Sequence, residues 1–153
     1  DKLILRLSGS VKVVCNPESE SGKKAALKTA ALVATGEILC FTDADCQNKP
    51  GWIRSMVRDF ENPKIQMIQG PVLIIENETI IGRIQQIEFL SLMQTSAGSI
   101  GNHNELLASG ANLAIRKQVY IDSLDSLKSS IHTGDDMFLL EYVKKKKYFQ
   151  IHH

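Results

Sequence analysis

The sequence predicts an α/β domain in which short apolar strands alternate with helices. Hydrophobic residues make up 43% and charged residues 23% of the 153 residues, which is typical of an ordinary soluble domain. Short β-branched runs alternate with stretches of helical periodicity, as in layered α/β proteins. A chain of this length suffices for one domain with a sizeable core. We therefore expect a single domain over residues 1–153.

The first elements follow from local composition. The β-branched run 11–15 predicts a strand that ends at Asn16-Pro17. An alanine-rich helix is expected to run to Ala34, with Gly36 at the position of a helix-ending glycine. Residues 37–42 are mostly apolar on both faces, as in a buried parallel strand.

A second helix is expected with Pro50 near its first position, because proline suits the first helical turn. Its apolar residues recur at helical spacing and form one face: Ile53, Met56, Val57 and Phe60. The later elements expected are strands over 65–69 and 71–75 joined through Gly70, a helix over 79–96, a loop over 97–105, a turn entering a strand over 108–116, helices over 118–124 and 135–146, and a strand over 148–151.

Charge and cysteine content exclude several classes of protein. Lys+Arg 18 against Asp+Glu 17 leaves a net charge of +1, which excludes a nucleic-acid module that binds by electrostatics alone. The three cysteines are odd in number and form no C-x-x-C pair, so neither a disulfide framework nor a zinc site is expected. Reduced thiols in the cytoplasm fit best.

Asp43-Ala44-Asp45 is the sharpest local feature. Carboxylates two residues apart project to the same side of an extended chain. These follow a predicted buried strand, at the end where ligands bind in open α/β sheets. Hard oxygen ligands suit magnesium or manganese, which would neutralise a departing diphosphate. A bare D-x-D is common, so spacing alone favours a polar strand end in which one Asp caps the loop.

Four other features suit a functional role, a structural role or both. Asp135-Asp136 precedes a helix and suits either N-capping, which is favoured, or a general base. Lys23 at a helix start suits an anion. The small residues of 109–112 suit either close approach of a ligand or a plain turn. Trp52 is interpreted as a packing residue rather than a sugar platform.

Taken together and in this order, these segments resemble family 2 glycosyltransferases of the GT-A fold. The matching pieces are Gly22–Lys28 (G-K-x-x-A-L-N, with Lys28 in place of Asn), Thr35–Asp45 (A-x-G-E-x-x-x-x-x-D-A-D), Pro50–Ile53 (P-x-W-I), Ser109–Lys117 (G-x-N-x-A-x-R-[RK]) and Gly134-Asp135-Asp136 (the family's Glu-Asp).

Two departures from the family pattern shape the expected fold. The family's first strands and the Asp-Asp-Gly-Ser type motif that helps hold the nucleotide have no counterpart before Val11. The Gln-x-x-Arg-Trp element of processive members is also absent. We therefore expect one incomplete catalytic domain: a partial GT-A fold with a mixed, mainly parallel sheet flanked by helices and lacking the first strands.

The resemblance implies an inverting, metal-assisted glycosyltransferase of the hexosyltransferase type. Asp45 would ligate the divalent cation, manganese or magnesium, and Asp43 would contact the metal-bound diphosphate or the ribose. Asp136 would be the general base, and Asp135 would support it or orient the acceptor. The remaining donor-binding residues implied are Lys23, Gly110, Ala111 and Asn112.

The implied partners are a nucleotide-diphosphate sugar donor and a glycan or lipid-linked acceptor, without nucleic acid. The implied location is the cytoplasm, including the cytoplasmic face of a membrane reached through other segments of the parent protein. The main alternative is a non-catalytic, truncated or degenerate nucleotide-sugar-binding domain. A phosphatase that uses the paired Asp is disfavoured, because Gln47 stands where that class needs Thr or Val.

Overall fold

The structure of the chain is a computed structural model that describes residues 12–17, 21–75, 79–101, 109–126, 135–146 and 150–152. It consists of two units, residues 1–35 and 36–153. The first contains α1 (Lys23–Val33), which ends at the extended cap residue Ala34 and so before Gly36. Residues 12–15 form no strand, contrary to the sequence prediction. Val13 is 59% exposed. A β-branched run forms a strand only where it packs against a neighbouring strand, so composition alone did not suffice here.

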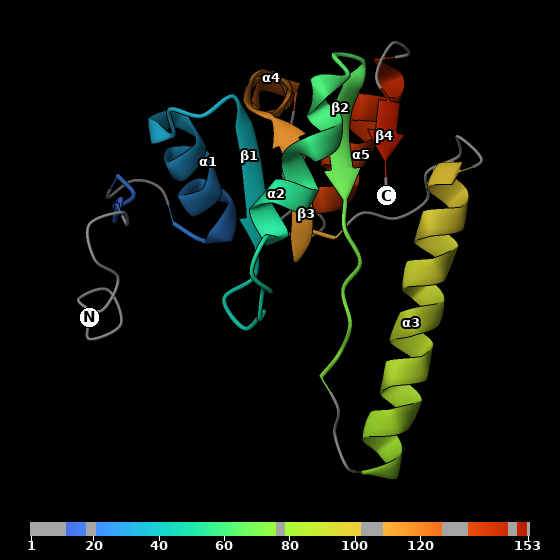
Figure 1. The fold of residues 1–153 in the computed structure, drawn as a ribbon. Coiled ribbons are helices and arrows are strands. Elements are labelled where there is room, and N and C mark those ends of the chain that lie inside the picture. Colours follow the sequence, from blue (N-terminus) through green and yellow to red (C-terminus); the bar gives the residue numbers. More distant parts are fainter. Residues whose placement is uncertain are drawn as a thin grey trace. The chain divides into compact units, whose positions relative to one another are not determined.

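The second unit contains a sheet of four described strands in the order β1-β3-β2-β4 (Figure 1). The strands are β1 (Ile38–Thr42), β2 (Ile65–Gln69), β3 (Asn112–Arg116) and β4 (Gln150–His152). β3 is antiparallel to both β1 and β2, and β4 is parallel to β2. The predicted mixed sheet is confirmed, with β1, β2 and β4 pointing the same way. The insertion of β3 between β1 and β2 was not predicted, and it makes their pairings with β3 antiparallel.

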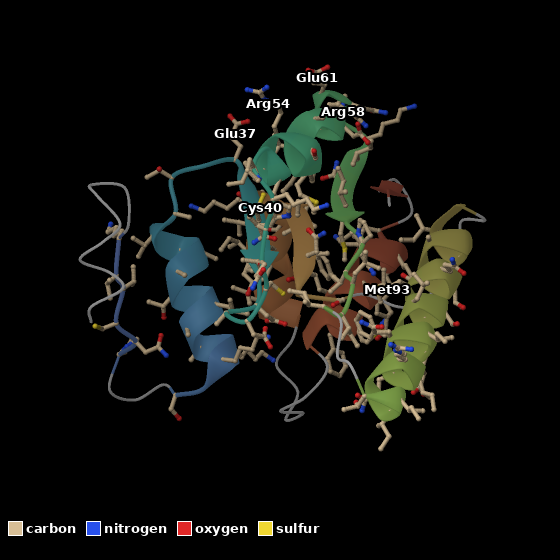
Figure 2. All side chains as sticks on the ribbon, turned by 60° about the horizontal axis from the view of Figure 1, so that its bottom comes forward. Glu37, Cys40, Arg54, Arg58, Glu61 and Met93 are labelled. Atoms are coloured by element: carbon tan, nitrogen blue, oxygen red, sulfur yellow. The ribbon has the colours of Figure 1, made fainter. Side chains whose placement is uncertain are left out.

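The core lies around the two central strands. Every residue of β2 is buried, as are Leu113, Ala114 and Ile115 of β3. The helix α2 (Trp52–Val57) and the 3-10 helix η2 (Arg58–Glu61) add Met56 and Phe60 to this core. Figure 2 shows Cys40 among these packed side chains, whereas Glu37, Arg54, Arg58 and Glu61 point outward.

The start of α2 fixes the position of Trp52. Gly51 precedes the helix with a φ of 85°, a left-handed conformation that glycine adopts without steric cost. The helix therefore begins at Trp52, after Pro50 rather than at it. Of the predicted apolar face, Met56 and Phe60 are buried, but Ile53 is 57% exposed.

The helix α3 (Ile80–Gly101) is longer than predicted, because residues 97–101 continue it instead of forming a loop. Met93, on the side that faces the sheet in Figure 2, is buried. Gln69 Nε2 of β2 donates a 3.1 Å hydrogen bond to Ser96 Oγ. The predicted strand over 71–75 is absent, because these residues pair with none of the described strands.

The helices α4 (Lys117–Ser126) and α5 (Asp135–Lys145) lie close to their predicted positions and pack against each other. Their buried residues are Val119, Tyr120 and Ser123 in α4, and Leu139, Leu140 and Val143 in α5. Among the described helices, none is both long enough and apolar enough to cross a membrane.

Candidate functional site

The strand order brings three chain segments to one edge of the sheet. Because β3 is antiparallel to β1, Thr42 at the end of β1 pairs with Asn112 at the start of β3. Gln69 at the end of β2 pairs with Leu113. The residues after β1, after β2 and before β3 are therefore neighbours, although they lie far apart in sequence.

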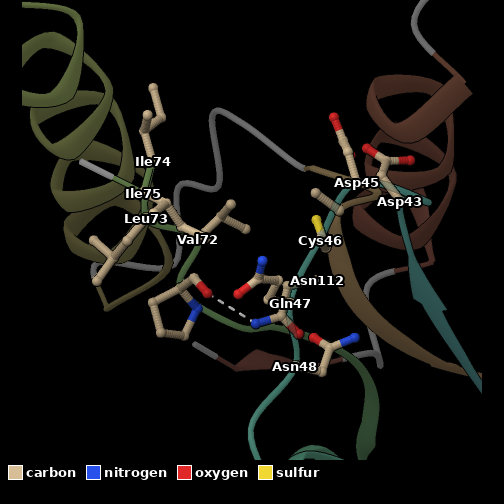
Figure 3. Close-up of a pocket in the computed structure, with 12 residues that line it drawn as sticks. Asp43, Asp45, Cys46, Gln47, Asn48, Val72, Leu73, Ile74, Ile75 and Asn112 are labelled. Carbon is tan, nitrogen blue, oxygen red and sulfur yellow. Dashed lines mark hydrogen bonds between the residues drawn. The ribbon is translucent and has the colours of Figure 1, made fainter. Parts of the chain in front are cut away.

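A pocket of about 380 Å³ opens at this edge (Figure 3). One part of its lining is polar and another is apolar. The polar part consists of Asp43, Asp45, Gln47, Asn48 and Asn112, with Cys46 between them. The apolar part consists of Pro71, Val72, Leu73, Ile74 and Ile75, with Ala111 beside Asn112.

The two carboxylates line the same pocket, but they do so from a turn. The Cys46 N–H donates a 3.1 Å hydrogen bond to the Asp43 carbonyl, which closes a turn over residues 43–46. The sequence argument from an extended chain is therefore wrong in its geometry, because the strand ends at Thr42. Asp43 is half-buried and Asp45 is exposed. Asn48 Nδ2 donates to Thr42 Oγ1 at 3.1 Å and ties the loop back to β1.

The carboxylates of Asp43 and Asp45 fit a divalent cation whose remaining ligands come from the substrate and water. Among the described residues, no group of three or more His, Cys, Asp or Glu side chains could hold a metal by itself. Magnesium typically binds one or two protein carboxylates and fills its shell with water and substrate phosphates, and manganese prefers similar oxygen ligands. Asp43 and Asp45 in one pocket match that requirement.

The amide of Asn112 is held at both ends. Its Oδ1 accepts a 2.8 Å hydrogen bond from Trp52 Nε1, and its Nδ2 donates a 2.9 Å bond to the Pro71 carbonyl. An indole N–H can only donate and a carbonyl can only accept, so the orientation of the amide is unambiguous. Trp52 also packs against the core cluster, as predicted. It thus connects core packing to a pocket residue.

Gly70 makes room for Asn112. A Cβ at this position would lie 2.7 Å from Asn112 Cγ and even closer to Nδ2. The Gly70 N–H also donates a 2.9 Å hydrogen bond to the Asn112 carbonyl. The sequence pattern predicted Gly70 only as the residue that joins two strands. A glycine beside a strand can also indicate the close approach of another chain segment, as it does here.

Four of the predicted site residues line the pocket together: Asp43, Asp45, Ala111 and Asn112. Gly110 directly precedes Ala111 and Asn112. It is half-buried and is not among the residues that line the pocket. Lys23 begins α1 in the other unit, and its role stays a prediction. Asp135 and Asp136 begin α5, but their side chains lie outside the described ones, so the choice between cap and base stays open.

Comparisons with known proteins identify the family of the chain. A sequence model of the family described as glycosyl transferase family 2 matches residues 2–124, which include every predicted site residue except Asp135 and Asp136. The chain is also similar to a pre-mycofactocin glycosyltransferase of Mycobacterium tuberculosis strain CDC 1551 / Oshkosh, with 23% identity over 131 residues. The same figures hold for the pre-mycofactocin glycosyltransferase of strain ATCC 25618 / H37Rv. The match covers 84% of this chain but only 27% of each relative, so the chain spans about a quarter of their length.

Proposed function

Since this chain belongs to glycosyl transferase family 2, and its α/β fold with a mixed sheet matches part of a GT-A fold, we propose that the protein moves a sugar from a nucleoside-diphosphate donor to an acceptor hydroxyl. The observation that carries this proposal is the meeting of Asp43, Asp45 and Asn112 in one pocket at the carboxyl end of β1. Ligands of open α/β sheets bind at such strand ends.

The carboxylates would bind the donor's diphosphate together with a divalent cation, manganese or magnesium. Such a cation neutralises charge on the leaving diphosphate. Asp45, the more exposed of the pair, holds the cation, and Asp43 shares it or contacts the ribose. Gly110, Ala111 and Asn112 border the donor sugar, where small side chains allow close approach to the backbone.

Asp136 would supply the general base at the start of α5. It accepts the proton of the acceptor hydroxyl while that oxygen attacks the anomeric carbon. The new carbon–oxygen bond forms as the bond to the diphosphate breaks, and the diphosphate leaves with the electron pair. A single displacement of this kind inverts the anomeric centre. Asp135 orients the acceptor or supports Asp136, and Lys23 contributes charge near the nucleotide.

The state of the thiols supports a proposal for the compartment. All three cysteines are free, which fits a reducing environment such as the cytoplasm. We place the reaction there, with a nucleotide sugar as the soluble donor.

The test is acceptor-dependent release of nucleoside diphosphate by the protein that carries this chain, with manganese and a panel of nucleotide sugars. Asp45→Asn should lower the rate by about 100-fold or more, as expected for loss of a group that acts on the transition state. Asp59→Asn is the matched control, because Asp59 bonds Arg58 on η2 and does not line the pocket. Full activity in excess chelator would exclude the metal role. Donor binding without turnover, for every donor and acceptor tried, would favour the non-catalytic alternative.

A further inference from the structure

We propose that Trp52 is a positioning residue of the donor site: its indole N–H holds the Asn112 amide in one orientation, and this orientation sets the affinity for the sugar part of the donor. The inference rests on the proposed function, which places Asn112 beside the donor sugar. It is carried by the two hydrogen bonds of the amide, by the contacts of the Asn112 backbone and by the packing of the indole.

Two contacts of opposite polarity fix the amide of Asn112. Trp52 Nε1 donates to Oδ1 at 2.8 Å, and Nδ2 donates to the Pro71 carbonyl at 2.9 Å. A flipped amide would place Nδ2 against the indole N–H and Oδ1 against the Pro71 carbonyl, so that donor faces donor and acceptor faces acceptor. Both contacts therefore oppose the flip, and the loss of either one weakens the constraint on the amide.

The fixed amide retains hydrogen-bonding capacity for a ligand. A primary amide offers two N–H groups and two lone pairs. Trp52 and Pro71 use one of each, which leaves one N–H and one lone pair of Asn112 for a ligand in the pocket that it lines. Asp43 and Asp45, which line the same pocket (Figure 3), only accept hydrogen bonds when they are ionised. Asn112 can therefore donate to a ring or hydroxyl oxygen of the sugar, which a carboxylate cannot do.

The backbone of Asn112 is held by two neighbouring segments. In the register of the sheet Asn112 pairs with Thr42 of β1, and its carbonyl accepts a 2.9 Å hydrogen bond from the Gly70 N–H at the end of β2. The side-chain torsions are then the main freedom left to Asn112, and Trp52 and Pro71 restrict them before a ligand arrives. A polar group that is already oriented binds a ligand at a smaller entropic cost.

Packing accounts for the ring of Trp52 but not for its N–H. The ring packs against a core cluster that consists of Met56, Phe60, Ile65, Ile68 and Ala114. A phenylalanine ring would supply such packing, whereas the indole adds a donor that reaches a pocket residue. The alternative is that Asn112 only provides a partner for the partly buried indole N–H. The two interpretations differ in the donor affinities that they predict for variants.

The first test compares nucleotide sugars with their nucleoside diphosphates. UDP-glucose with UDP, and GDP-mannose with GDP, are titrated into the protein with manganese present, by isothermal calorimetry. Trp52→Phe should raise the dissociation constant of the nucleotide sugar by about 3- to 10-fold, as expected for one weakened hydrogen bond. The dissociation constant of the nucleoside diphosphate should change less than about twofold, because the weakened bond goes to the sugar. Equal weakening of both ligands, or of neither, would overturn the inference.

A double-mutant cycle in donor affinity shows whether Trp52 acts through Asn112. Asn112→Ala should weaken nucleotide-sugar binding at least as much as Trp52→Phe does, and the double variant should bind as weakly as Asn112→Ala alone. Additive effects would contradict the proposal, since Trp52 would then act by another route.

A second replacement removes the N–H and keeps the shape of the ring. It places 3-benzothienylalanine at position 52, where sulfur takes the place of the indole N–H in a ring of nearly the same size. This variant should lose nucleotide-sugar affinity as Trp52→Phe does. Wild-type affinity would show that the ring matters and the N–H does not, which would overturn the inference.

Phe60→Leu is the matched control. Phe60 belongs to the same core cluster and does not line the pocket. The variant should unfold at a lower temperature and keep the wild-type affinity for nucleotide sugars. If Phe60→Leu weakens binding as much as Trp52→Phe, a loosened core explains both results and the inference fails.

Transfer assays with the intact protein separate this inference from the proposed function. Trp52→Phe should raise the donor KM and leave kcat near the wild-type value, as for an interaction made equally in the ground state and the transition state. Normal transfer with a wild-type KM would overturn the inference and leave the proposed function standing. Nucleotide-sugar binding that depends on Trp52, without transfer to any acceptor, would support the inference and contradict the transferase. A wild-type protein that binds none of the nucleotide sugars would contradict both.

Discussion

The indole of Trp52 donates a 2.8 Å hydrogen bond to the side-chain carbonyl of Asn112, a residue 60 positions further along the chain. Trp52 begins α2 and packs against the core, and Asn112 begins β3 and lines the pocket. The packing of a helix on the sheet thereby sets the orientation of a side chain that we place beside the donor sugar.

Trp52→Phe should uncouple this connection. Phenylalanine keeps an aromatic ring against the core but removes the N–H, so the partly buried Asn112 Oδ1 loses its partner. The free energy of unfolding should fall by about 1–3 kcal/mol. Denaturant unfolding followed by circular dichroism measures the change, because the variant lacks the fluorescent residue.

A double-mutant cycle with Asn112→Ala identifies the contact. If the hydrogen bond is responsible, the two substitutions together should cost less than the sum of the single effects, with an interaction energy of about 0.5 kcal/mol or more. Strict additivity would show that the effect of Trp52→Phe comes from core packing alone.

Gly70→Ala should destabilise the same corner from the opposite side. The added Cβ would lie 2.7 Å from Asn112 Cγ, and overpacking of this kind costs about 1–3 kcal/mol. The Asn112 side chain should be displaced and donor binding weakened. A second substitution, Asn112→Ala, should recover much of the lost stability because it removes the atoms in conflict.

Gly98→Ala is the control for this prediction. A Cβ at Gly98 would meet no described atom within 4 Å beyond its chain neighbours and the adjacent backbone of its own helix, α3. Alanine should therefore stabilise the protein by about 0.5–1 kcal/mol through helix propensity. Thermal unfolding of the two variants should show shifts of opposite sign, and destabilisation by both would refute the close-approach argument.

Local patterns predicted most elements, and they failed where a strand needed a partner. Residues 37–42 and 65–69 correspond closely to β1 and β2, and the alanine-rich stretch forms α1. The equally strand-like runs 11–15 and 71–75 form no strand in their described residues. Pairing is a long-range property, so composition cannot distinguish a paired run from an unpaired one.

The candidate site was predicted in part for the same reason. The resemblance identified Asp43, Asp45 and Asn112, which the strand order then brings together. The contacts of Trp52 and Gly70 with Asn112 depend on residues distant in sequence, and no local motif encodes them. The exposure of Leu73, Ile74 and Ile75 was not predicted, because their run was interpreted as a strand.

Arg116→Lys should lower stability without a direct effect on the pocket. The guanidinium donates hydrogen bonds to the carbonyls of Ile65 at 2.9 Å and Phe60 at 2.8 Å, and it lies 5.3 Å from the Phe60 ring centroid. A lysine cannot reproduce this fork of donors. We expect a loss of about 1–3 kcal/mol in denaturant unfolding. Lys117→Arg, at the neighbouring position, should change stability little, and equal stability of wild type and Arg116→Lys would show that the fork contributes nothing.

Cys40 should make stability fall in alkaline solution. Burial raises the pKa of its thiol above the ordinary value of 9.0, since the side chain packs against the core cluster. The unfolded chain then loses this proton at a lower pH than the folded chain does. The contribution is present below about pH 9 and is lost as the pH rises towards the folded pKa. Unfolding measured on both sides of this pH should show a smaller decrease for Cys40→Ala than for wild type, while the exposed Cys15→Ala should behave as wild type.

Asp136→Asn separates the two interpretations of the start of α5. Asparagine keeps the size and the capping oxygen of aspartate, but it cannot take a proton from an acceptor hydroxyl. If Asp136 is the general base, turnover should fall by about 100-fold or more while donor affinity and melting temperature stay unchanged. Asp136→Ala removes both properties and should also lower the melting temperature, by the loss of about 1 kcal/mol for a missing cap. The measurements are acceptor-dependent diphosphate release, donor titration and thermal unfolding of both variants. Near wild-type turnover in Asp136→Asn, together with a lowered melting temperature in Asp136→Ala, would make this residue a helix cap and place the base elsewhere.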